Sequence, residues 1–572
     1  MFIGLVFLIS LIPISAVSSA YPQLSIADIQ GDGWSTPYYR QTVETTGIVT
    51  ADYQYEAKRG FFLQDPIGDG DPSTSDGVFV YAPYYYGLLV DVGDEISITA
   101  RVTEYYGMTE LDYVKDITIL STGNELPVPV ELNPPFEDDA SDQYYESLEG
   151  MYVISSKLRV IQGTDKFGEF AGLRGDLGIN RVFQNDPLGT GEIIFVAQDG
   201  GLLLNVKSGQ ILKDLIGPLD YTYGEYRVQP SIDNVPKILP NRSWNDFSYG
   251  FGHAFDQNSA SISIATFNML NFFDDIVDPG KLQTTSASSL LTTEELDLKI
   301  SKLAYAIHEN LREPDLIGVE EVEKIELLQR LAGTDPIKAD YGVILFDGPD
   351  VRGIDVGLMY RLDKVKILGW ESKQTCTTLD DGLGPGSDPN YACDDGLNPL
   401  FSRRPLVVHL ESLKTSEDFY VIVNHFKSKS EGDEVTTPRR VEQASFVGSL
   451  VDGIESQDHH AKVIVIGDFN DFEDRLPLTT LEESGLHNLI FKVNKHTRYT
   501  YIYNGISECL DHMLVNPSMM RLFERIRIVH FNPDFPFPQY SIDPTTGIAS
   551  SDHDVIISTF NLGHHHHFSF GK

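Results

Sequence analysis

The sequence is poor in basic side chains. It has 43 lysines and arginines against 84 aspartates and glutamates, for a formal net charge of −41. Such a chain lacks the broad basic surface with which many proteins hold nucleic acids. Residues 1–254 contain 15 basic and 35 acidic side chains, and residues 255–572 contain 28 and 49. The acidity therefore extends over both parts of the chain and is not confined to a tail.

Cysteine is also scarce, with three residues in 572. Cys376 and Cys393 bracket a loop rich in glycine, aspartate and proline, and we expect a disulfide there if the protein is exported. The acidic loop Asp380–Asp395 has two interpretations, a Ca²⁺ site or a solvated loop pinned by the two cysteines. Cys509 is left over and is predicted to be a buried thiol.

Only one long apolar run is present, at residues 1–20. It ends with the small residues Ser18 and Ala20, a pattern that predicts a cleaved signal peptide. An uncleaved anchor is the alternative, although the run is short for the ~20 residues of a membrane span. We expect a secreted, extracellular monomer whose mature form has no membrane contact.

The length suggests three or more domains, at ~100–200 residues each. Residues 21–125 contain about five short strands and no convincing helix, which predicts a small β-barrel or sandwich. Within it, Gly60–Pro66 and Ser75–Tyr81 resemble oligonucleotide/oligosaccharide-binding (OB) barrels. Residues 126–243 repeat this texture and predict a second OB-like module.

The role of these modules has two interpretations, a spacer or a binding surface. Exposed rings could stack on single strands, but little positive charge lies beside them. The rings belong to Tyr84, Tyr85, Tyr86, Tyr105 and Tyr106. An acidic segment, residues 65–76, could hold a structural Ca²⁺ or form a plain turn.

From residue 255 to residue 562 strands alternate with amphipathic helices, as in layered α+β domains. The central stretch is residues 463–474, where four β-branched residues predict a strand buried on both faces. Gly467 would end this strand, so that Asp468 and Asn470 project from it. Taken alone, this pattern fits an ordinary Asx turn equally well.

Six motifs decide between these readings. In order they are Phe267-Asn268, Val319-Glu320-Glu321-Val322, Asn424-His425-Phe426-Lys427, Gly467-Asp468-Phe469-Asn470, Leu510-Asp511-His512 and Ser551-Asp552-His553. This series resembles the endonuclease/exonuclease/phosphatase superfamily, which includes deoxyribonuclease-I-like enzymes. The resemblance implies an α+β fold: a four-layer α/β/β/α sandwich catalytic domain preceded by the two small all-β modules. The arrangement is most similar to the multidomain secreted nucleases of microbes.

The resemblance also implies roles for the site residues. His553 is the general base or phosphate ligand, Asp511 holds its imidazole, and His425 assists the leaving oxygen. Asp468 and Asn470 orient water and phosphate. Glu321, Asn268 and Asp552 hold Mg²⁺ or Mn²⁺, although the choice between Glu320 and Glu321 stays open. Arg403, Arg352 and Lys427 are the predicted phosphate-binding residues, and Asp355 is a candidate to orient His425.

The predicted function is a secreted, divalent-metal-dependent nuclease that hydrolyses DNA with low sequence specificity. The sequence leaves open whether RNA is also cut. One alternative is another phosphoesterase on the same scaffold: a nucleotidase, an inositol-phosphate phosphatase or a sphingomyelinase. The other is a surface binding protein without catalysis. The tail, residues 563–572, contains four histidines and is read as a flexible terminus rather than a metal chelator.

Overall fold

The computed structural model describes residues 21–186, 188–239, 260–277 and 291–563. The predicted signal peptide and nearly all of the histidine-containing tail lie outside these residues. The chain divides into two compact units. The first comprises Met1–Lys157, Ile194–Leu203 and Lys213–Lys237, and the second comprises Leu158–Ile193, Leu204–Leu212 and Ile238–Lys572.

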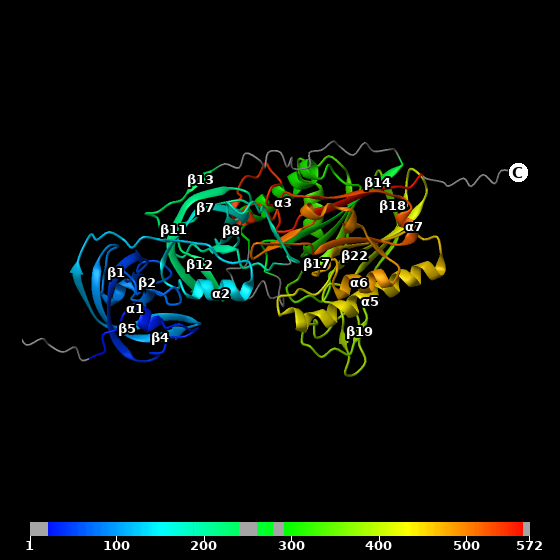
Figure 1. The fold of residues 1–572 in the computed structure, drawn as a ribbon. Helices are drawn as coiled ribbons and strands as arrows, with labels where there is room; N and C mark the ends of the chain where they lie inside the picture. Colours follow the sequence, from blue (N-terminus) through cyan, green and yellow to red (C-terminus); the bar gives the residue numbers. More distant parts are fainter. Residues whose placement is uncertain (1–20, 187, 240–259, 278–290, 564–572) are drawn as a thin grey trace, which may run out of the picture. The chain divides into compact units, whose positions relative to one another are not determined.

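The first unit contains a closed five-stranded barrel in the order β1-β2-β3-β5-β4 (Figure 1). Its strands are β1 (Thr42–Asp52), β2 (Gly60–Gln64), β3 (Gly77–Tyr81), β4 (Glu95–Tyr105) and β5 (Met108–Ser121). Alternate residues of β4 point into the barrel, as the two-residue period of a strand requires. The five strands predicted from the sequence are thus present, together with the short helix α1 (Ile26–Gln30). Their likeness to OB barrels stays a prediction.

A second closed barrel over residues 126–243 is not confirmed. Helix α2 (Asp138–Glu146) interrupts the predicted all-β segment. The strands that follow are divided between the two compact units, with β10 (Ile194–Val196) and β12 (Glu225–Val228) in the first and β8 (Phe170–Arg174) and β9 (Val182–Phe183) in the second. The remaining strands of this region are β6 (Val130–Glu131), β7 (Tyr152–Gln162), β11 (Ile211–Thr222) and β13 (Lys237–Leu239).

The second unit is built on two six-stranded sheets. One has the order β16-β17-β15-β14-β29-β28 and the other β18-β21-β22-β23-β27-β24. The first contains β14 (Ser261–Phe272), β15 (Leu316–Val322), β16 (Tyr341–Leu345), β17 (Asp355–Arg361), β28 (Phe523–Val529) and β29 (Val555–Asn561). The second contains β18 (Val365–Ser372), β21 (Leu406–Ser412), β22 (Asp418–His425), β23 (Val463–Asp468), β24 (His487–Asn488) and β27 (Asp511–Val515).

Three hydrophobic clusters define the layers of this unit. One lies between the sheets and joins residues such as Ile264 and Leu358 to Val421 and Ile464. A second packs α3 (Thr293–Tyr305) and α4 (Ile325–Ala332) on the first sheet. A third packs α5 (Asp433–Gln457) and α6 (Leu476–Glu483) on the second sheet. Figure 1 shows α5 and α6 on one side of the sandwich and α3 on the other, so the layer order is α/β/β/α.

Smaller elements complete the second unit. Strands β25 (Tyr501–Tyr503) and β26 (Ile506–Glu508) form a hairpin, and β9 pairs with β26 in parallel. Strands β19 (Cys376–Thr377) and β20 (Asn398–Pro399) form a two-stranded sheet, and α7 (Pro517–Met520) precedes β28. Cys376 and Cys393 form a disulfide. Cys509 is fully buried, as expected. No helix in the described ranges is long and apolar enough to cross a membrane.

Candidate active site

Three neighbouring strands of the second sheet place polar residues side by side at the ends of the strands. His425 of β22 is the register partner of Asp468 in the parallel strand β23, and Asp468 faces Asp511 of the antiparallel strand β27. Gly467 allows this close approach, because a Cβ atom there would lie 1.9 Å from the carbonyl oxygen of Asn424. Its φ of 138° also favours glycine.

The first sheet contributes Asn268 and Glu320, which are register partners on β14 and β15. The side-chain amide of Asn268 donates a hydrogen bond to Asp468 Oδ2 at 3.2 Å. Glu320 is fully buried, and its Oε1 accepts a hydrogen bond from the Thr266 hydroxyl at 2.8 Å. The site therefore joins the central strands of both sheets.

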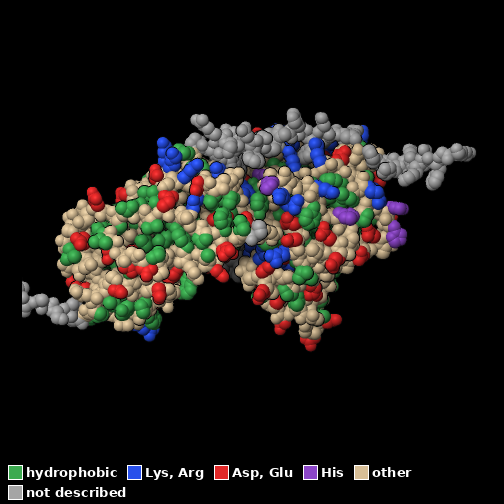
Figure 2. Space-filling model, viewed as in Figure 1, with side chains coloured by type: hydrophobic (Ala, Val, Ile, Leu, Met, Phe, Trp, Pro, Cys, Tyr) green, Lys and Arg blue, Asp and Glu red, His purple; other side chains and the backbone are tan. Residues whose placement is uncertain are grey.

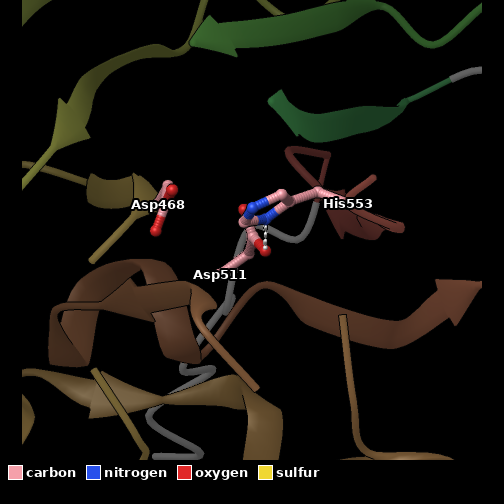
Figure 3. A group of neighbouring side chains, drawn as sticks. All are labelled: Asp468, Asp511 and His553. Carbon is pink, nitrogen blue, oxygen red and sulfur yellow. Dashed lines mark hydrogen bonds and ion pairs between the residues drawn. The ribbon is translucent and has the colours of Figure 1, made fainter. Parts of the chain in front are cut away.

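His553, which lies two residues before the start of β29, completes this group. Its Nδ1 donates to Asp511 Oδ2 at 2.8 Å, and Figure 3 shows the imidazole of His553 beside the two carboxylates. One ligand atom from each of Asp468, Asp511 and His553 lies within 4.8 Å of the others. The ring of Tyr501 packs against the imidazole with centroids 4.8 Å apart.

The loop that carries His553 is held by one buried side chain, Asn532. Its amide nitrogen donates to the carbonyl oxygen of His553 at 2.6 Å. Its amide oxygen accepts from the backbone of Ser550 at 2.9 Å and of Ser551 at 3.2 Å. The Ser551 hydroxyl in turn donates to the Asn268 carbonyl at 2.6 Å. Asn532 thus holds the backbone of the loop at Ser550, Ser551 and His553, and the Ser551 hydroxyl ties the loop to β14 of the first sheet.

The electrostatic environment separates the two histidines. Burial opposes protonation of His553, but the adjoining carboxylate of Asp511 outweighs burial and raises the pKa of His553 well above the usual value. Burial lowers the pKa of His425 well below the usual value, and the positive charges of Arg403 and Arg352 lower it further. Burial also raises the pKa of Asp468 to about 7, an effect that His553 opposes and Asp511 reinforces.

The two adjacent glutamates of β15 have different surroundings. Burial, with Asp511 adding to it, raises the pKa of Glu320 well above its usual range. Glu321 has a left-handed backbone with φ of 60°, and its Oε2 accepts a hydrogen bond from the Asn271 backbone at 2.8 Å. Burial raises the pKa of Asp552, and the negative charge of Glu321 raises it further. The charge of His553 opposes the shift at Asp552, and the charge of Glu321 also raises the pKa of Asp468, so both carboxylates belong to the electrostatic surroundings of this group.

The donor set fits a divalent cation. In the described part of the chain, two buried carboxylate oxygens at the site have no hydrogen-bond partner, Oδ1 of Asp511 and Oε2 of Glu320. A buried carboxylate oxygen without a donor is costly, and a hard cation that prefers oxygen ligands would satisfy it. The group of Asp468, Asp511 and His553 is where such ligands converge. The assignment of Glu321, Asn268 and Asp552 as the metal ligands stays a prediction.

Asn470 adopts a left-handed conformation with φ of 51°. Its backbone amide donates to Asp468 Oδ1 at 2.8 Å, and its side-chain amide donates to the Phe426 carbonyl at 3.2 Å. Asn470 therefore sets the orientation of the Asp468 carboxylate through an Asx turn. The two interpretations of this segment, a turn or a functional site, thus describe the same structure.

The predicted phosphate-binding residues already have partners. Arg403 is buried, bonded to Asp350 at 3.1 Å and to the Phe426 carbonyl at 2.6 Å. Lys427 lies 2.8 Å from Glu431. Arg352, with its side chain 44% exposed, lies 4.0 Å from Glu321. Of the three, Arg352 is therefore the most available to an incoming phosphate.

The predicted contact of Asp355 with His425 is not formed. Nδ1 of His425 is buried and has no hydrogen-bond partner among the described side chains and backbone. Asp355 Oδ1 instead accepts the Gly348 amide at 2.9 Å. On its other side, Nε2 of His425 lies 3.6 Å from Asp468 Oδ2. Asp468, and not Asp355, is therefore the carboxylate beside His425.

The two acidic loops for which Ca²⁺ binding was one of two interpretations are held by protein contacts. In residues 65–76, Asp65 Oδ1 and Asp76 Oδ1 accept backbone amides of the same loop. In residues 380–395, Asp381 pairs with Arg439 at 2.5 Å, and Asp388 pairs with Arg404. These bonds fit the readings of a plain turn and a pinned loop. Calcium binding stays a prediction for both.

Sequence reasoning missed several residues that support the site. Asn532 and Tyr501 carry no local motif, and their roles depend on contacts across the fold. Arg181, from the segment preceding the catalytic domain, donates to Asp534 at 2.5 Å and to the Ser507 hydroxyl at 2.9 Å. Gln184 donates to Glu473 at 2.9 Å. A segment assigned to the second β module therefore belongs structurally to the catalytic unit.

Two family models match parts of the chain. Residues 263–529 match the model of the Endonuclease/Exonuclease/phosphatase family, and residues 129–240 match a domain of unknown function, DUF8508. No curated protein matched the chain.

Three solved structures show the extent of the likeness. An endonuclease/exonuclease/phosphatase family protein from Bacteroides thetaiotaomicron is 19% identical, with 54% of this chain and 98% of that chain covered and a TM-score of 0.35. D. rerio TDP2 complexed with single strand DNA product is 18% identical, with 53% and 99% covered and a TM-score of 0.35. A mannosyl-6-phosphatase from Bacteroides thetaiotaomicron is 17% identical, with 52% and 98% covered and a TM-score of 0.34.

Proposed function

We propose that this chain is a secreted, divalent-metal-dependent nuclease. The premise is that it belongs to the endonuclease/exonuclease/phosphatase family through residues 263–529. The family consists of metal-dependent phosphoesterases, and the chain is a phosphoesterase of this class. The finer proposal is that its substrate is extracellular DNA, cut with low sequence specificity. The predicted signal peptide supports the extracellular location.

One observation carries the proposal. The hydrogen bond of 2.8 Å between His553 Nδ1 and Asp511 Oδ2 lies beside Asp468, in a group whose ligand atoms fall within 4.8 Å of one another. A carboxylate that holds one imidazole nitrogen fixes the tautomer and directs the other nitrogen toward the reacting atoms. The site thus combines a histidine placed for proton transfer with carboxylates placed for a cation.

The chemistry of hydrolysis assigns each group a task. A water oxygen bonds to phosphorus while the bond from phosphorus to the leaving oxygen breaks; the water loses a proton and the leaving oxygen gains one. His553 Nε2 receives or holds a proton at the attacking side or binds a phosphate oxygen. His425, buried beside Asp468, serves the leaving oxygen. Asp468 and Asn470 orient the water and the phosphate.

A divalent cation, when bound, supplies positive charge that stabilises the developing charge on the phosphate and leaving oxygens. Glu321, Asn268 and Asp552 are the residues proposed to hold it, with Asp468 and Asp511 adjoining. Mg²⁺ or Mn²⁺ suits these oxygen ligands. The chain's own part is to hold this set rigidly at the ends of the central strands.

A second candidate function is supported by the basic side chains. Arg403 and Lys427 are already paired with carboxylates, and the chain is strongly acidic. A long polyanion requires several free cations along its backbone, whereas a small phosphoester requires only one or two. This favours, as the alternative, a nucleotidase, an inositol-phosphate phosphatase or a sphingomyelinase.

The test is hydrolysis by the purified full chain. Supercoiled plasmid, a mononucleotide, an inositol phosphate and sphingomyelin vesicles are each incubated with Mg²⁺ or with EDTA. The proposal expects plasmid to be nicked with Mg²⁺ and intact with EDTA. Hydrolysis of a small phosphoester alone would favour the second candidate, and no metal-dependent hydrolysis of any substrate would contradict both.

The matched control is a pair of histidine variants. His553→Ala removes the proposed proton-transfer group, while His409→Ala removes a partly exposed histidine that pairs with Asp418 at 2.7 Å on β21. If His553→Ala loses hydrolytic activity and His409→Ala retains it, the activity is assigned to this site. Equal activity in both variants would contradict that assignment.

A further inference from the structure

The first compact unit contains a cavity of about 1370 Å³ beside its barrel. This is larger than the ~300–1,000 Å³ of pockets for drug-sized ligands. Seven tyrosines are among its lining residues. Four of them have strongly exposed side chains: Tyr105 61%, Tyr106 85%, Tyr113 69% and Tyr223 92%. We call this feature the tyrosine cavity.

Exposed aromatic rings gathered around a hollow are unusual for a soluble surface. Scattered apolar residues are normal, but a contiguous patch around a concave site marks a binding surface. Figure 2 shows hydrophobic side chains, tyrosine included, gathered over the barrel region of the molecule. Tyrosine offers a flat, rigid face with a hydroxyl at its edge, which suits a ligand that is apolar on its faces and polar on its rim.

The tyrosine surface continues into a neighbouring hollow of about 380 Å³, which shares Ala57 and Arg59 with the tyrosine cavity. There the rings of Tyr55 and Tyr84 are stacked, with centroids 4.8 Å apart and an angle of 14° between the planes. Two adjoining hollows with aromatic walls form an elongated surface. This shape fits a chain of several rings better than a single small molecule.

The wall of the cavity carries a buried carboxyl group. Glu110 is 7% exposed and accepts no hydrogen bond from any described residue. Burial raises its pKa to about 7. The nearby amine of Lys58 is already engaged, 2.5 Å from Asp220 and 4.7 Å from the centre of the Phe79 ring. Glu110 therefore has hydrogen-bonding capacity that the protein leaves unused.

The charges of the lining exclude a polyanion. Its acidic members are Glu110, Asp112 and Asp199, of which Asp112 is paired with Arg101, and its basic members are Lys58 and Arg59. Lys58 is neutralised by Asp220, so Arg59 alone would face the phosphates of a bound strand. Nucleic-acid binding gains most of its affinity from cations that neutralise phosphates. A ligand without phosphates meets no such obstacle.

We propose that the tyrosine cavity binds a neutral oligosaccharide chain, whose sugar rings stack on Tyr105, Tyr106 and Tyr113 and whose hydroxyls hydrogen-bond to Glu110. Sugar rings have apolar C–H faces that pack on aromatic planes, and a rim of hydroxyls that donate to carboxylates. This site is separate from the proposed phosphoesterase site and does not depend on it. Its role is to hold the protein on a glycan.

The experiment uses the full chain and an array of neutral oligosaccharides of glucose, mannose, galactose and N-acetylglucosamine. The best hexasaccharide is then titrated by calorimetry, with a twelve-residue oligothymidylate as a second probe. We expect the hexasaccharide to bind and the oligothymidylate not to bind in the cavity. Tyr106→Ala and Tyr113→Ala should each weaken the hexasaccharide about tenfold, the equivalent of one lost stacking contact.

The matched control is Tyr39→Ala, which removes a ring that is 48% exposed in the same unit but outside the cavity. Glu110→Gln tests the hydrogen bonds with little change of shape and should also weaken binding. Circular dichroism of each variant establishes that it is folded. Three results would each overturn the proposal. They are a failure to bind any glycan, a loss of affinity in Tyr39→Ala equal to that in the cavity variants, and tyrosine-dependent binding of the oligothymidylate.

Discussion

His553 and Asp511 meet across the two sheets of the second unit: Nδ1 of the imidazole lies 2.8 Å from Oδ2 of the carboxylate. The two residues are 42 positions apart in sequence; Asp511 begins β27 of the second sheet, and His553 lies in the loop before β29 of the first sheet. Both are buried, with exposures of 6% for His553 and 1% for Asp511. The pairing therefore exists only in the assembled sandwich, and it couples folding to the proposed chemistry.

Asp511→Asn is predicted to reduce turnover on DNA by about 10²–10⁴-fold, because the amide cannot hold the imidazole in the same protonation state. The size of the side chain is unchanged, so the thermal midpoint should fall much less than the activity. Steady-state kinetics and calorimetry measure the two effects. Asp418→Asn, on the exposed partner of His409, serves as control, and an active Asp511→Asn enzyme would contradict the assigned role.

Asn532→Ala is predicted to reduce both stability and turnover. The substitution removes the donor to the His553 carbonyl and the acceptor for Ser550 and Ser551. Each buried group left without a partner costs about 1–3 kcal/mol. Chemical denaturation measures the free energy of unfolding, and plasmid nicking measures the turnover. Unchanged activity in a destabilised variant would show that Asn532 supports the fold without positioning His553.

Arg181→Ala is predicted to destabilise the second unit by about 3–5 kcal/mol, because it leaves Asp534 buried without its charged partner. Arg181 and Asp534 have side-chain exposures of 9% and 2% and lie 2.5 Å apart. The thermal midpoint of the full chain should fall. Arg174→Ala, in the same region but paired with the exposed Asp176, should leave it nearly unchanged. Equal midpoints for the two variants would contradict this account.

Stability of the first unit is predicted to decrease with rising pH through Glu110. Burial raises its pKa in the folded state to about 7, with Asp112, Asp220 and Glu104 adding and Lys58 opposing, whereas an unfolded glutamate titrates near ~4.3. The folded state thus binds the proton of Glu110 more tightly than the unfolded state does. The stability that this proton contributes is fully present below about pH 4 and is lost as the pH rises through 7.

The measurement is the thermal midpoint of the native chain and of Glu110→Gln at pH 5 and at pH 8. The neutral amide has no proton to lose, so the native chain should lose more stability than the variant over this range. Parallel changes in the two proteins would show that Glu110 does not contribute.

The sequence predicted much of the second unit because its signals are local. Four β-branched residues before Gly467 indicated a buried strand, and β23 contains them; it does not end at Gly467 as predicted but continues to Asp468. The six motifs in order predicted the family, which the family model confirms, and the structure gathers His425, Asp468, Asp511 and His553. The pattern of short strands broken by turns likewise predicted the strands of the barrel.

Other features depend on contacts that no local pattern encodes. No local sequence pattern distinguishes an arginine that is free from one that pairs with a distant carboxylate. The bond of Arg403 to Asp350 was therefore not predictable. The amide contacts of Asn532 and the long-range pairing of Arg181 have no motif either. The segment around Arg181 was predicted within a β module because its strands are short, yet its partners lie more than 300 residues away.

The measurement that tests the central claim most directly is nicking of supercoiled plasmid by the purified full chain with Mg²⁺, with EDTA, and with His553→Ala. The account predicts nicking with Mg²⁺, none with EDTA, and a loss of about a hundredfold or more in the variant. A His553→Ala protein that cuts plasmid as fast as the native chain, or a native chain equally active in EDTA, would contradict it.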